Sequence, residues 1–385
     1  MQELSSKLNG FTESIIRKMT RVANKYGAIN LSQGFPDFDP PKEIMQGLKD
    51  VSFKGPHQYE ITWGSVEFRK RLAEKQRRFM GIDIDPEKNI VVTCGSTEAM
   101  MVSLMSVCNP GDKVIVFSPF YENYGADTIL VGAKPIYVPL VPPDFNFNKE
   151  TLKKAFEQKP KALILCNPSN PTGKVFTRNE LLYIAKLAKE YDTYVITDEV
   201  YEHIVYKPNK HIYMASLPGM FERTLSCSSL SKTYSITGWR LGYIIASDKI
   251  IDNCKKVHDF LTVGAAAPLQ KAVLPALSFG DEYYEKLLEL YTRKRDIFVG
   301  GLDKIGLKYY KPQGAYYVLV DISEFGEKND YKFCEWLAKE IGVAAVPGSS
   351  FFKENVTNYI RFHFAKKDET LIEAVKRLEK LKNFR

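Results

Sequence analysis

The chain has 385 residues, a formal charge of +8, and 44% apolar and 26% charged residues, a length and composition typical of globular proteins with more than one hydrophobic core. Its lysines and arginines are scattered rather than gathered into a basic stripe, which predicts a solvated surface and no nucleic-acid partner. No stretch reaches the roughly 18 apolar residues of a membrane span, so we expect no membrane partner and no export signal.

Six cysteines stand at positions 94, 108, 166, 227, 254 and 334. None forms a Cys-x-x-Cys pair or has a histidine at ligand spacing, which disfavours a zinc site and a disulfide framework. We therefore expect no metal, and reduced, largely buried thiols in a cytoplasmic protein.

Short apolar runs alternate with helical patterns over most of the chain. The runs are Ile90–Thr93, Val114–Phe117, Ala162–Cys166, Tyr194–Thr197, Leu225–Cys227 and Gly242–Ala246. Each is typical of a strand buried on both faces. Residues 179–191 repeat apolar side chains at helical spacing, with Thr177 and Glu180 as a candidate capping box. This alternation predicts an α/β fold with a mostly parallel sheet sandwiched by helices and with sites at the carboxyl ends of its strands.

The pattern changes near residue 280. A long charged helix over 281–303 precedes strands at 315–321 and 359–364 and an amphipathic helix from 368 to about 381. We expect an N-terminal segment of residues 1–40, a large domain of residues 41–280, and a smaller α+β C-terminal domain of residues 281–385, on which the N-terminal segment packs.

The stretch Ser229-Leu-Ser-Lys232 … Gly238-Trp-Arg240 sets a lysine among phosphate-binding groups at the end of a predicted strand. An amine forms a Schiff base with a carbonyl, while hydroxyls and a fork-shaped guanidinium hold a phosphate. The candidate cofactor is therefore pyridoxal 5'-phosphate. Taken alone, Lys232 would be read as a solvated surface charge.

A second phosphate-binding stretch is Cys94-Gly95-Ser96-Thr97, which follows one predicted strand and opens into a helix over 99–107. Free backbone N–H groups, two hydroxyls and the positive end of the helix dipole all suit a phosphate. The alternative is a plain Ser/Thr N-cap.

Polar residues also follow other predicted strands. Asp198 comes directly after one of them, where a buried carboxylate requires a partner such as a protonated pyridine nitrogen, or else caps the next turn. Asn170 lies in a rigid Asn-Pro turn that holds its amide outside the sheet. Arg361 alternates with apolar neighbours, so it either faces inward to bind a carboxylate or lies on the wet face of an edge strand.

These motifs together resemble the class I/II aminotransferases, fold-type I enzymes that use pyridoxal 5'-phosphate. The agreement runs along nearly the whole chain, through Gly34 in Ser32-Gln-Gly-Phe-Pro-Asp-Phe38, Tyr59 ahead of Trp63-Gly-Ser65, Gly95-Ser-Thr97, Pro119-Phe-Tyr121, Asn170-Pro-Thr-Gly173, Asp198 with Tyr201, Lys232, Arg240 and Arg361. Nine motifs in the family's order are far more specific than any one of them.

The resemblance implies a role for each matched residue. Lys232 would hold the cofactor covalently as an aldimine and move the substrate's proton, Asp198 would keep the ring nitrogen protonated, and Tyr201 would bond the ring oxygen. The remaining cofactor contacts would be Gly95, Ser96, Thr97, Tyr121, Asn170, Ser229 and Arg240, joined by Tyr59 from the neighbouring subunit of a homodimer. The substrate carboxylate would be bound by Gly34, Asn170 and Arg361.

The motifs are most similar to the kynurenine, glutamine, methionine and aromatic branch of the family. A dicarboxylate specialist usually adds a second arginine from the partner subunit, and the matching loop, residues 259–266, has none. We therefore expect neutral, bulky amino donors, a 2-oxo acid acceptor such as 2-oxoglutarate, and a side-chain pocket that uses Phe35, Phe351 or Phe352. The alternatives are an aspartate or broad-specificity aminotransferase, a C–S lyase of the same fold, and an amino-acid sensor, which would need an added DNA-binding domain.

Overall fold

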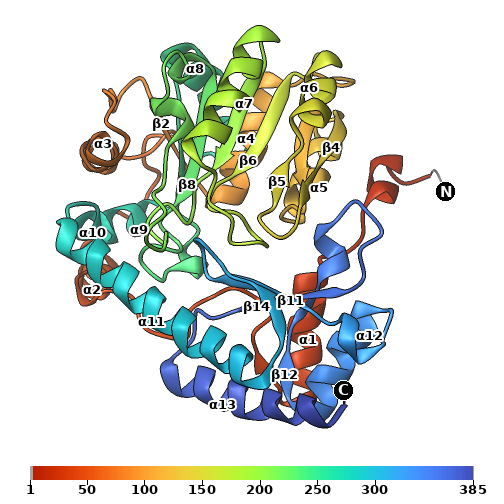
Figure 1. Cartoon of the computed structure of the whole chain (residues 1–385). Helices are drawn as coiled ribbons and strands as arrows, with labels where there is room; N and C mark the ends of the chain where they lie inside the picture. The colour runs from red at the N-terminus through yellow and green to blue at the C-terminus, as the bar shows by residue number, and fades with distance from the viewer. Residues whose placement is uncertain (1–2, 385) are drawn as a thin grey trace.

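An eight-stranded sheet with helices against both faces forms the upper part of the computed structural model, which describes residues 3–384 (Figure 1). Its strand order is β2-β9-β8-β7-β6-β3-β4-β5. The six predicted strands are all present, as β2 (Ile90–Thr93), β3 (Lys113–Ser118), β6 (Ala162–Cys166), β7 (Tyr194–Asp198), β8 (Thr224–Ser229) and β9 (Gly242–Ile245). The sequence prediction missed β4 (Lys134–Val141) and β5 (Asn146–Phe147), because two prolines within β4 argue against a strand in the middle of a sheet.

The pairing confirms the predicted mostly parallel sheet. Strands β4, β3, β6, β7 and β8 pair in parallel, and β9 runs antiparallel between β2 and β8. Gly242 at the start of β9 is aligned with Thr93 on one side and Ser229 on the other. The chain segments that follow β2 and β8 therefore leave the same edge of the sheet side by side.

Alternate residues of β6 enter two different cores, as expected for a strand buried on both faces. Leu163 and Leu165 pack with side chains of α6 and α7, whereas Ala162 and Ile164 pack with those of α4 and α8. The α-helices between residues 40 and 280 are α2 (Lys42–Lys54), α3 (Val66–Met80), α4 (Ser96–Val107), α5 (Asn123–Leu130), α6 (Lys149–Glu157), α7 (Arg178–Glu190), α8 (Asp248–Thr262), α9 (Ala267–Ala272) and α10 (Leu274–Leu277). The capping box at Thr177 and Glu180 is confirmed at the start of α7.

A smaller antiparallel sheet, in the order β10-β11-β14-β13, lies below the large one (Figure 1). Its strands are β10 (Lys308–Tyr310), β11 (Tyr317–Asp321), β13 (Val346–Pro347) and β14 (Tyr359–His363), and its helices are α11 (Asp281–Ile305), α12 (Asp330–Trp336) and α13 (Asp368–Leu378). The predicted long helix and final helix are both present. The second predicted strand of this region is confirmed, and the first begins two residues later than expected.

The N-terminal segment lies against this smaller region. Its helix α1 (Ile15–Tyr26) leads into β1 (Ile29–Asn30), which pairs in parallel with β12 (Val343–Ala344). The domain boundaries at residues 40 and 280 stay predictions. All six cysteines are free thiols, four of them buried, and no helix among residues 3–384 is long and apolar enough to cross a membrane.

Candidate active site

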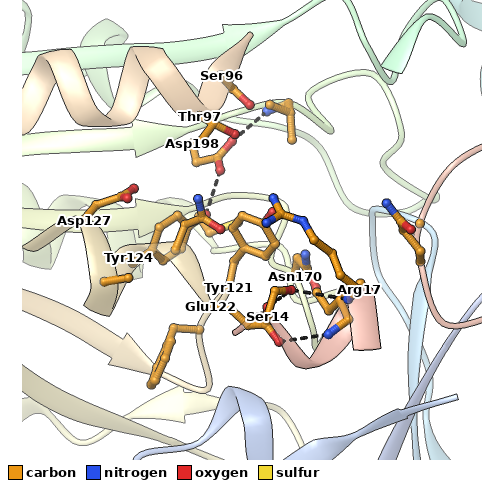
Figure 2. Close-up of a pocket in the computed structure, with 18 of the residues that line it drawn as sticks. Ser14, Arg17, Ser96, Thr97, Tyr121, Glu122, Tyr124, Asp127, Asn170 and Asp198 are labelled. Atoms are coloured by element: carbon orange, nitrogen blue, oxygen red, sulfur yellow. Dashed lines mark hydrogen bonds between the residues drawn. The ribbon is translucent and has the colours of Figure 1, made fainter. Parts of the chain in front are cut away.

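A cavity of about 830 Å³ opens where the carboxyl ends of the large sheet face the smaller one. All the predicted site residues line it except Gly95 and Tyr59: Gly34, Ser96, Thr97, Tyr121, Asn170, Asp198, Tyr201, Ser229, Lys232, Arg240 and Arg361. Figure 2 shows five of them: Ser96 and Thr97 at the start of α4, Tyr121 just before α5, Asn170 after β6 and Asp198 at the end of β7. The fold thus gathers residues up to 327 positions apart around one space (Gly34 to Arg361).

One end of the cavity is the N-terminus of α4. Gly95 precedes the helix with φ of 81°, a conformation that favours glycine, and no side chain caps the first turn. Ser96 and Thr97 make no side-chain hydrogen bond within residues 3–384, so their hydroxyls stay available to a ligand. The plain N-cap alternative is therefore wrong, and this end has the free donors and the dipole that an anion requires.

Arg240 completes this end of the cavity. Its guanidinium lies so close to Gly95 that a Cβ there would come within 2.2 Å of Nη2, so Gly95 lies next to this end of the cavity although it does not line it. Nη1 donates to the carbonyl of Thr237 at 2.9 Å. Ser229 is buried nearby on β8, and the buried hydroxyl of Ser231 has no partner within the described chain. Two more hydroxyls thus accompany the guanidinium.

Asp198 lies at the end of β7 and is only 7% exposed. Its Oδ2 accepts a hydrogen bond from the hydroxyl of Tyr124 at 2.7 Å, and its Oδ1 accepts from the backbone N–H of Val200 at 3.4 Å. The carboxylate therefore does contact the following turn, as the capping alternative expects, but it also faces the cavity. Burial raises the pKa of Asp198, opposed by the hydrogen bond from Tyr124. It forms no ion pair within residues 3–384, so a cationic ligand group would stabilise it.

Lys232 is not the solvated surface charge of the alternative interpretation. Its Nζ donates to the carbonyl oxygen of Gly34 at 3.2 Å and lies above the rings of Tyr316 and Tyr201. Burial, and then the neighbouring Arg240, lower the pKa of Lys232 to about 8. A much larger fraction of this amine than of an ordinary lysine is consequently uncharged near neutral pH, as a nucleophile or a general base must be.

Two tyrosines, Tyr201 and Tyr121, line the cavity together with Asp198. Tyr201 is buried, and its hydroxyl lies 2.9 Å from that of Tyr317. Tyr121 precedes α5, and its ring packs edge-on against Tyr124. Burial raises the pKa of Tyr201, so this phenol stays protonated and can donate a hydrogen bond.

Arg361 is fully buried on β14. Because β14 lies between β11 and β13, the edge-strand alternative is wrong. Nη1 donates to Oδ1 of Asn170 and Nη2 to the carbonyl of Ser32, each at 2.7 Å, while Nε has no partner within the described residues. The guanidinium carbon lies 4.3 Å from the centre of the Tyr317 ring. These contacts fix a positive charge at the cavity wall.

Gly34 allows the segment after β1 to lie close to Tyr317 of β11. A Cβ at this position would lie 2.2 Å from the hydroxyl oxygen of Tyr317, and the Gly34 carbonyl accepts from Tyr316 at 2.9 Å. Of the phenylalanines predicted for a side-chain pocket, Phe35 lines the cavity. Phe351 is buried against Arg361, and Phe352 is half-buried and packs on Tyr359, and neither lines the cavity.

Tyr59 lies away from the cavity of its own chain and is 89% exposed. It lines a separate hollow together with residues 262–268, which overlap the loop that lacks a second arginine. The structure therefore does not bring Tyr59 together with the other predicted site residues of the same chain.

The sequence analysis did not single out three further cavity residues: Tyr124, Ser231 and Asp127. Tyr124 follows Tyr121 by one helical turn, and Ser231 lies within the lysine stretch itself, so spacing alone could have suggested both. Asp127 is buried with one carboxylate oxygen unpartnered in the described chain, and burial raises its pKa to about 7, with a further contribution from Asp198. Only the packing of α5 reveals that this residue faces the cavity.

Known proteins resemble this chain along almost its whole length. Residues 26–378 match the family model described as aminotransferase class I and II. A probable N-succinyldiaminopimelate aminotransferase of Mycobacterium tuberculosis is 35% identical over 98% of both chains, and the solved structure of that enzyme superposes with a TM-score of 0.95 over 98% of this chain and 100% of the other. The methionine aminotransferase of Escherichia coli is 35% identical over 98% of both chains. Kynurenine–oxoglutarate transaminase 3 of Rattus norvegicus is 34% identical over 95% of this chain and 88% of its own.

Proposed function

The chain belongs to the class I and II aminotransferase family and is an aminotransferase of fold type I, and from this premise we propose that it transfers the α-amino group of a neutral, bulky amino acid to a 2-oxo acid. The proposed donors are aromatic amino acids, methionine, kynurenine or glutamine, and the proposed acceptor is 2-oxoglutarate. The observation that carries the proposal is the meeting of Lys232, Asp198 and Arg361 in one cavity.

Enzymes of this family use pyridoxal 5'-phosphate, and the residues of this chain fit that group. The hydroxyls of Ser96, Thr97 and Ser231 are without hydrogen-bond partners within residues 3–384, and Arg240 stands beside them, so they suit the phosphate. The buried carboxylate of Asp198 suits a protonated ring nitrogen. When bound, the cofactor supplies an aldehyde for covalent attachment to Lys232 and a ring that accepts electrons.

Lys232 would serve as the general base of the reaction. Its lowered pKa, about 8, gives it an uncharged amine that can take the proton from the substrate's α-carbon. Its bond to the Gly34 carbonyl holds it on the side of the cavity where Arg361 lies. Asp198, held in position by Tyr124, would keep its negative charge opposite the ring nitrogen, and Tyr201 would donate its phenolic proton to the ring oxygen.

Arg361 and Asn170 would bind the substrate's α-carboxylate. Arg361 is already oriented by Asn170 and Ser32, so it would lose little side-chain entropy when the substrate binds. A guanidinium fork binds a carboxylate through two parallel hydrogen bonds, which fixes the direction of the α-carbon relative to Lys232.

A homodimer would account for Tyr59, with its phenol reaching the phosphate of the neighbouring subunit. Val263, which lines the same hollow as Tyr59, is 51% exposed in the single chain, and Phe260, three residues before it at the end of α8, is 92% exposed. Burying such a patch is a common reason for association. Sedimentation of the purified protein tests this, and a monomer would contradict it.

A panel of amino donors assayed with 2-oxoglutarate tests the function. We expect phenylalanine or methionine to be used better than aspartate. Aspartate as the best donor by a wide margin would instead favour the aspartate or broad-specificity alternative. A C–S lyase would instead release ammonia and leave no aminated cofactor after a single half-reaction.

The covalent attachment has its own test. Borohydride reduction of the loaded protein followed by peptide mass spectrometry should find the cofactor on Lys232. A colourless protein after incubation with pyridoxal phosphate, with no adduct at this position, would contradict the proposed chemistry.

A further inference from the structure

A buried glutamate and a buried histidine meet at the first turn of α4, which together with Arg240 forms the phosphate site proposed above. Glu98 is the third residue of α4, and His258 lies on α8. Oε1 of Glu98 lies 2.7 Å from Nδ1 of His258, and the two side chains are 9% and 0% exposed. Neither residue lines the cavity, so any effect of this pair on a bound cofactor must act through α4 or through charge.

The hydrogen bonds of His258 assign it a positive charge. Its Nε2 lies 3.0 Å from the carbonyl oxygen of Thr62, which can only accept, so Nε2 carries a proton. Its Nδ1 faces the carboxylate of Glu98. That carboxylate already accepts from the Thr262 hydroxyl at 2.8 Å and from the backbone N–H of Cys94. Because these two donors stabilise the ionised form of Glu98, the proton between the two side chains belongs on Nδ1, and the pair is an imidazolium and a carboxylate.

The electrostatics of Glu98 agree with this assignment. Burial by itself would raise the pKa of Glu98, but the hydrogen bond and the charge of His258, with the bonds from Cys94 and Thr262, lower it below its ordinary value. The carboxylate is therefore negative at neutral pH. It also lies in the first turn of a helix, where the helix dipole stabilises a negative charge.

An ionised glutamate at this position opposes the binding of a phosphate. The backbone N–H groups of Ser96, Thr97 and Glu98 donate to no acceptor within residues 3–384, so the turn offers three donors to an anion. The carboxylate of Glu98 belongs to the same turn and would repel a phosphate monoester, which carries a charge of about −1.5 to −2 near neutral pH. It would also offset the positive charge of Arg240. A positive charge on His258 removes both effects.

We propose that His258 neutralises Glu98 and thereby keeps the phosphate site net positive, while Glu98 holds the first turn of α4 through the N–H of Cys94. This inference rests on the proposed function, because it assumes that the turn binds the phosphate of pyridoxal 5'-phosphate. His258 is a positioning residue that acts through Glu98. In ordinary helix capping, by contrast, a glutamate at the third position bonds only to the backbone N–H at the helix start.

Cofactor affinity measured with and without a phosphate tests this role. Pyridoxal has the ring and the aldehyde of pyridoxal 5'-phosphate but no phosphate. The preference for the phosphorylated form, obtained by absorbance titration of the cofactor-free protein with each compound, therefore reports on the phosphate site. We expect His258→Asn, which keeps a donor toward Glu98 but loses the charge, to lower this preference at least about tenfold. Glu98→Gln should keep it within about threefold of the wild-type value, and the double variant should return to that range, because the charge that His258 offsets is then absent.

A purely structural role predicts a different pattern. If the pair only held α4 in place, each variant would weaken the binding of both compounds, and the losses would add in the double variant. An unchanged preference in His258→Asn, or a double variant no better than His258→Asn, would overturn the proposal. A loss of preference beyond about threefold in Glu98→Gln would also overturn it, and this variant decides the question if His258→Asn does not fold. Glu150→Gln, in the exposed first turn of α6, is the matched control and should leave both affinities unchanged.

The proposed function fails by a different measurement. A wild-type protein that transfers no amino group from any donor, but still prefers pyridoxal 5'-phosphate to pyridoxal, would contradict the function and leave the role of His258 intact. A wild-type protein that binds both compounds equally would contradict the phosphate site and the role of His258 together.

Discussion

The two ends of the cavity are built in different ways. At the end where we propose that the phosphate binds, the phosphate end, Ser96 follows β2, Ser229 ends β8 and Arg240 precedes β9, and Gly242 of β9 is aligned with both β2 and β8. At the end where we propose that the substrate carboxylate binds, the substrate end, Gly34 and Arg361 come from opposite ends of the chain and meet because the N-terminal segment packs on the smaller sheet. The comparison shows that backbone register builds one end and contacts between distant segments build the other.

The two ends also differ in how many of their polar side-chain atoms already have hydrogen-bond partners within the protein. The hydroxyls of Ser96, Thr97 and Ser231 have no partners within the described chain, whereas Arg361 already has two short hydrogen bonds and two ring contacts. The phosphate end is therefore prepared for a group with many acceptor atoms. The substrate end presents a single oriented cation.

Lys232 lies between the two ends, and its replacement should have the largest effect. We expect Lys232→Ala to lower the rate of amino transfer by at least the 10²- to 10⁴-fold typical of lost acid–base catalysis, because Lys232 is the one lysine among the described residues that line the cavity. Stopped-flow measurement of one half-reaction checks this. Lys271→Ala, which removes an exposed lysine paired with Glu67, should leave the rate unchanged.

Arg361→Lys should damage the substrate end alone. Lysine keeps the charge but not the planar fork, so one or two charge-assisted hydrogen bonds of about 1.5 to 3 kcal/mol are lost. We expect kcat/KM to fall about 10- to 10²-fold for every amino donor, with cofactor affinity preserved. Arg293→Lys, on the exposed surface, is the control. Equal losses of substrate and cofactor binding would show that the two ends are not independent.

Gly95→Ala should damage the phosphate end alone. The new Cβ would meet the guanidinium of Arg240, so we expect the affinity for pyridoxal phosphate to fall about tenfold, measured by titration of its absorbance. Gly81 has a similar positive φ but open space around it, so Gly81→Ala should cost only about 1 kcal/mol of stability from backbone strain. An unchanged affinity of Gly95→Ala for pyridoxal phosphate would contradict the placement of Arg240 in the phosphate site.

Asp127 should give the smallest effect, on stability rather than on rate. Its pKa in the folded protein, about 7, lies above the ordinary value of 3.8, so the folded form holds a proton that the unfolded chain releases. Stability should therefore fall as pH rises through this window, by about 1.4 kcal/mol per unit, and level off above it. Asp127→Asn should flatten that slope in thermal melts of the cofactor-free protein from pH 5 to 8. Asp252→Asn, on the surface, is the control and should leave that slope unchanged.

Much of the phosphate end could be predicted from the sequence, because its residues follow recognisable strands at short spacing. The Ser229 to Arg240 stretch and the Gly95-Ser-Thr97 turn were both identified this way, and the structure brings them together. What spacing could not decide was the choice between a capped helix and an open one, which depends on where each hydroxyl points.

Less of the substrate end could be predicted from the sequence. Alternation along residues 359–364 left Arg361 either inward or on a wet edge, and only the position of β14 between two other strands decided it. Asp127 carries no signal in its local sequence, since it is an ordinary charged residue of a helix.

By itself the sequence determined the alternating architecture, the family, the lysine and the residues that suit a phosphate, because buried strands and tight turns constrain their own residue types. Only the tertiary structure decided which charges are buried, paired or free. Charge burial and pairing depend on elements far apart along the chain, and no local pattern records which of them meet.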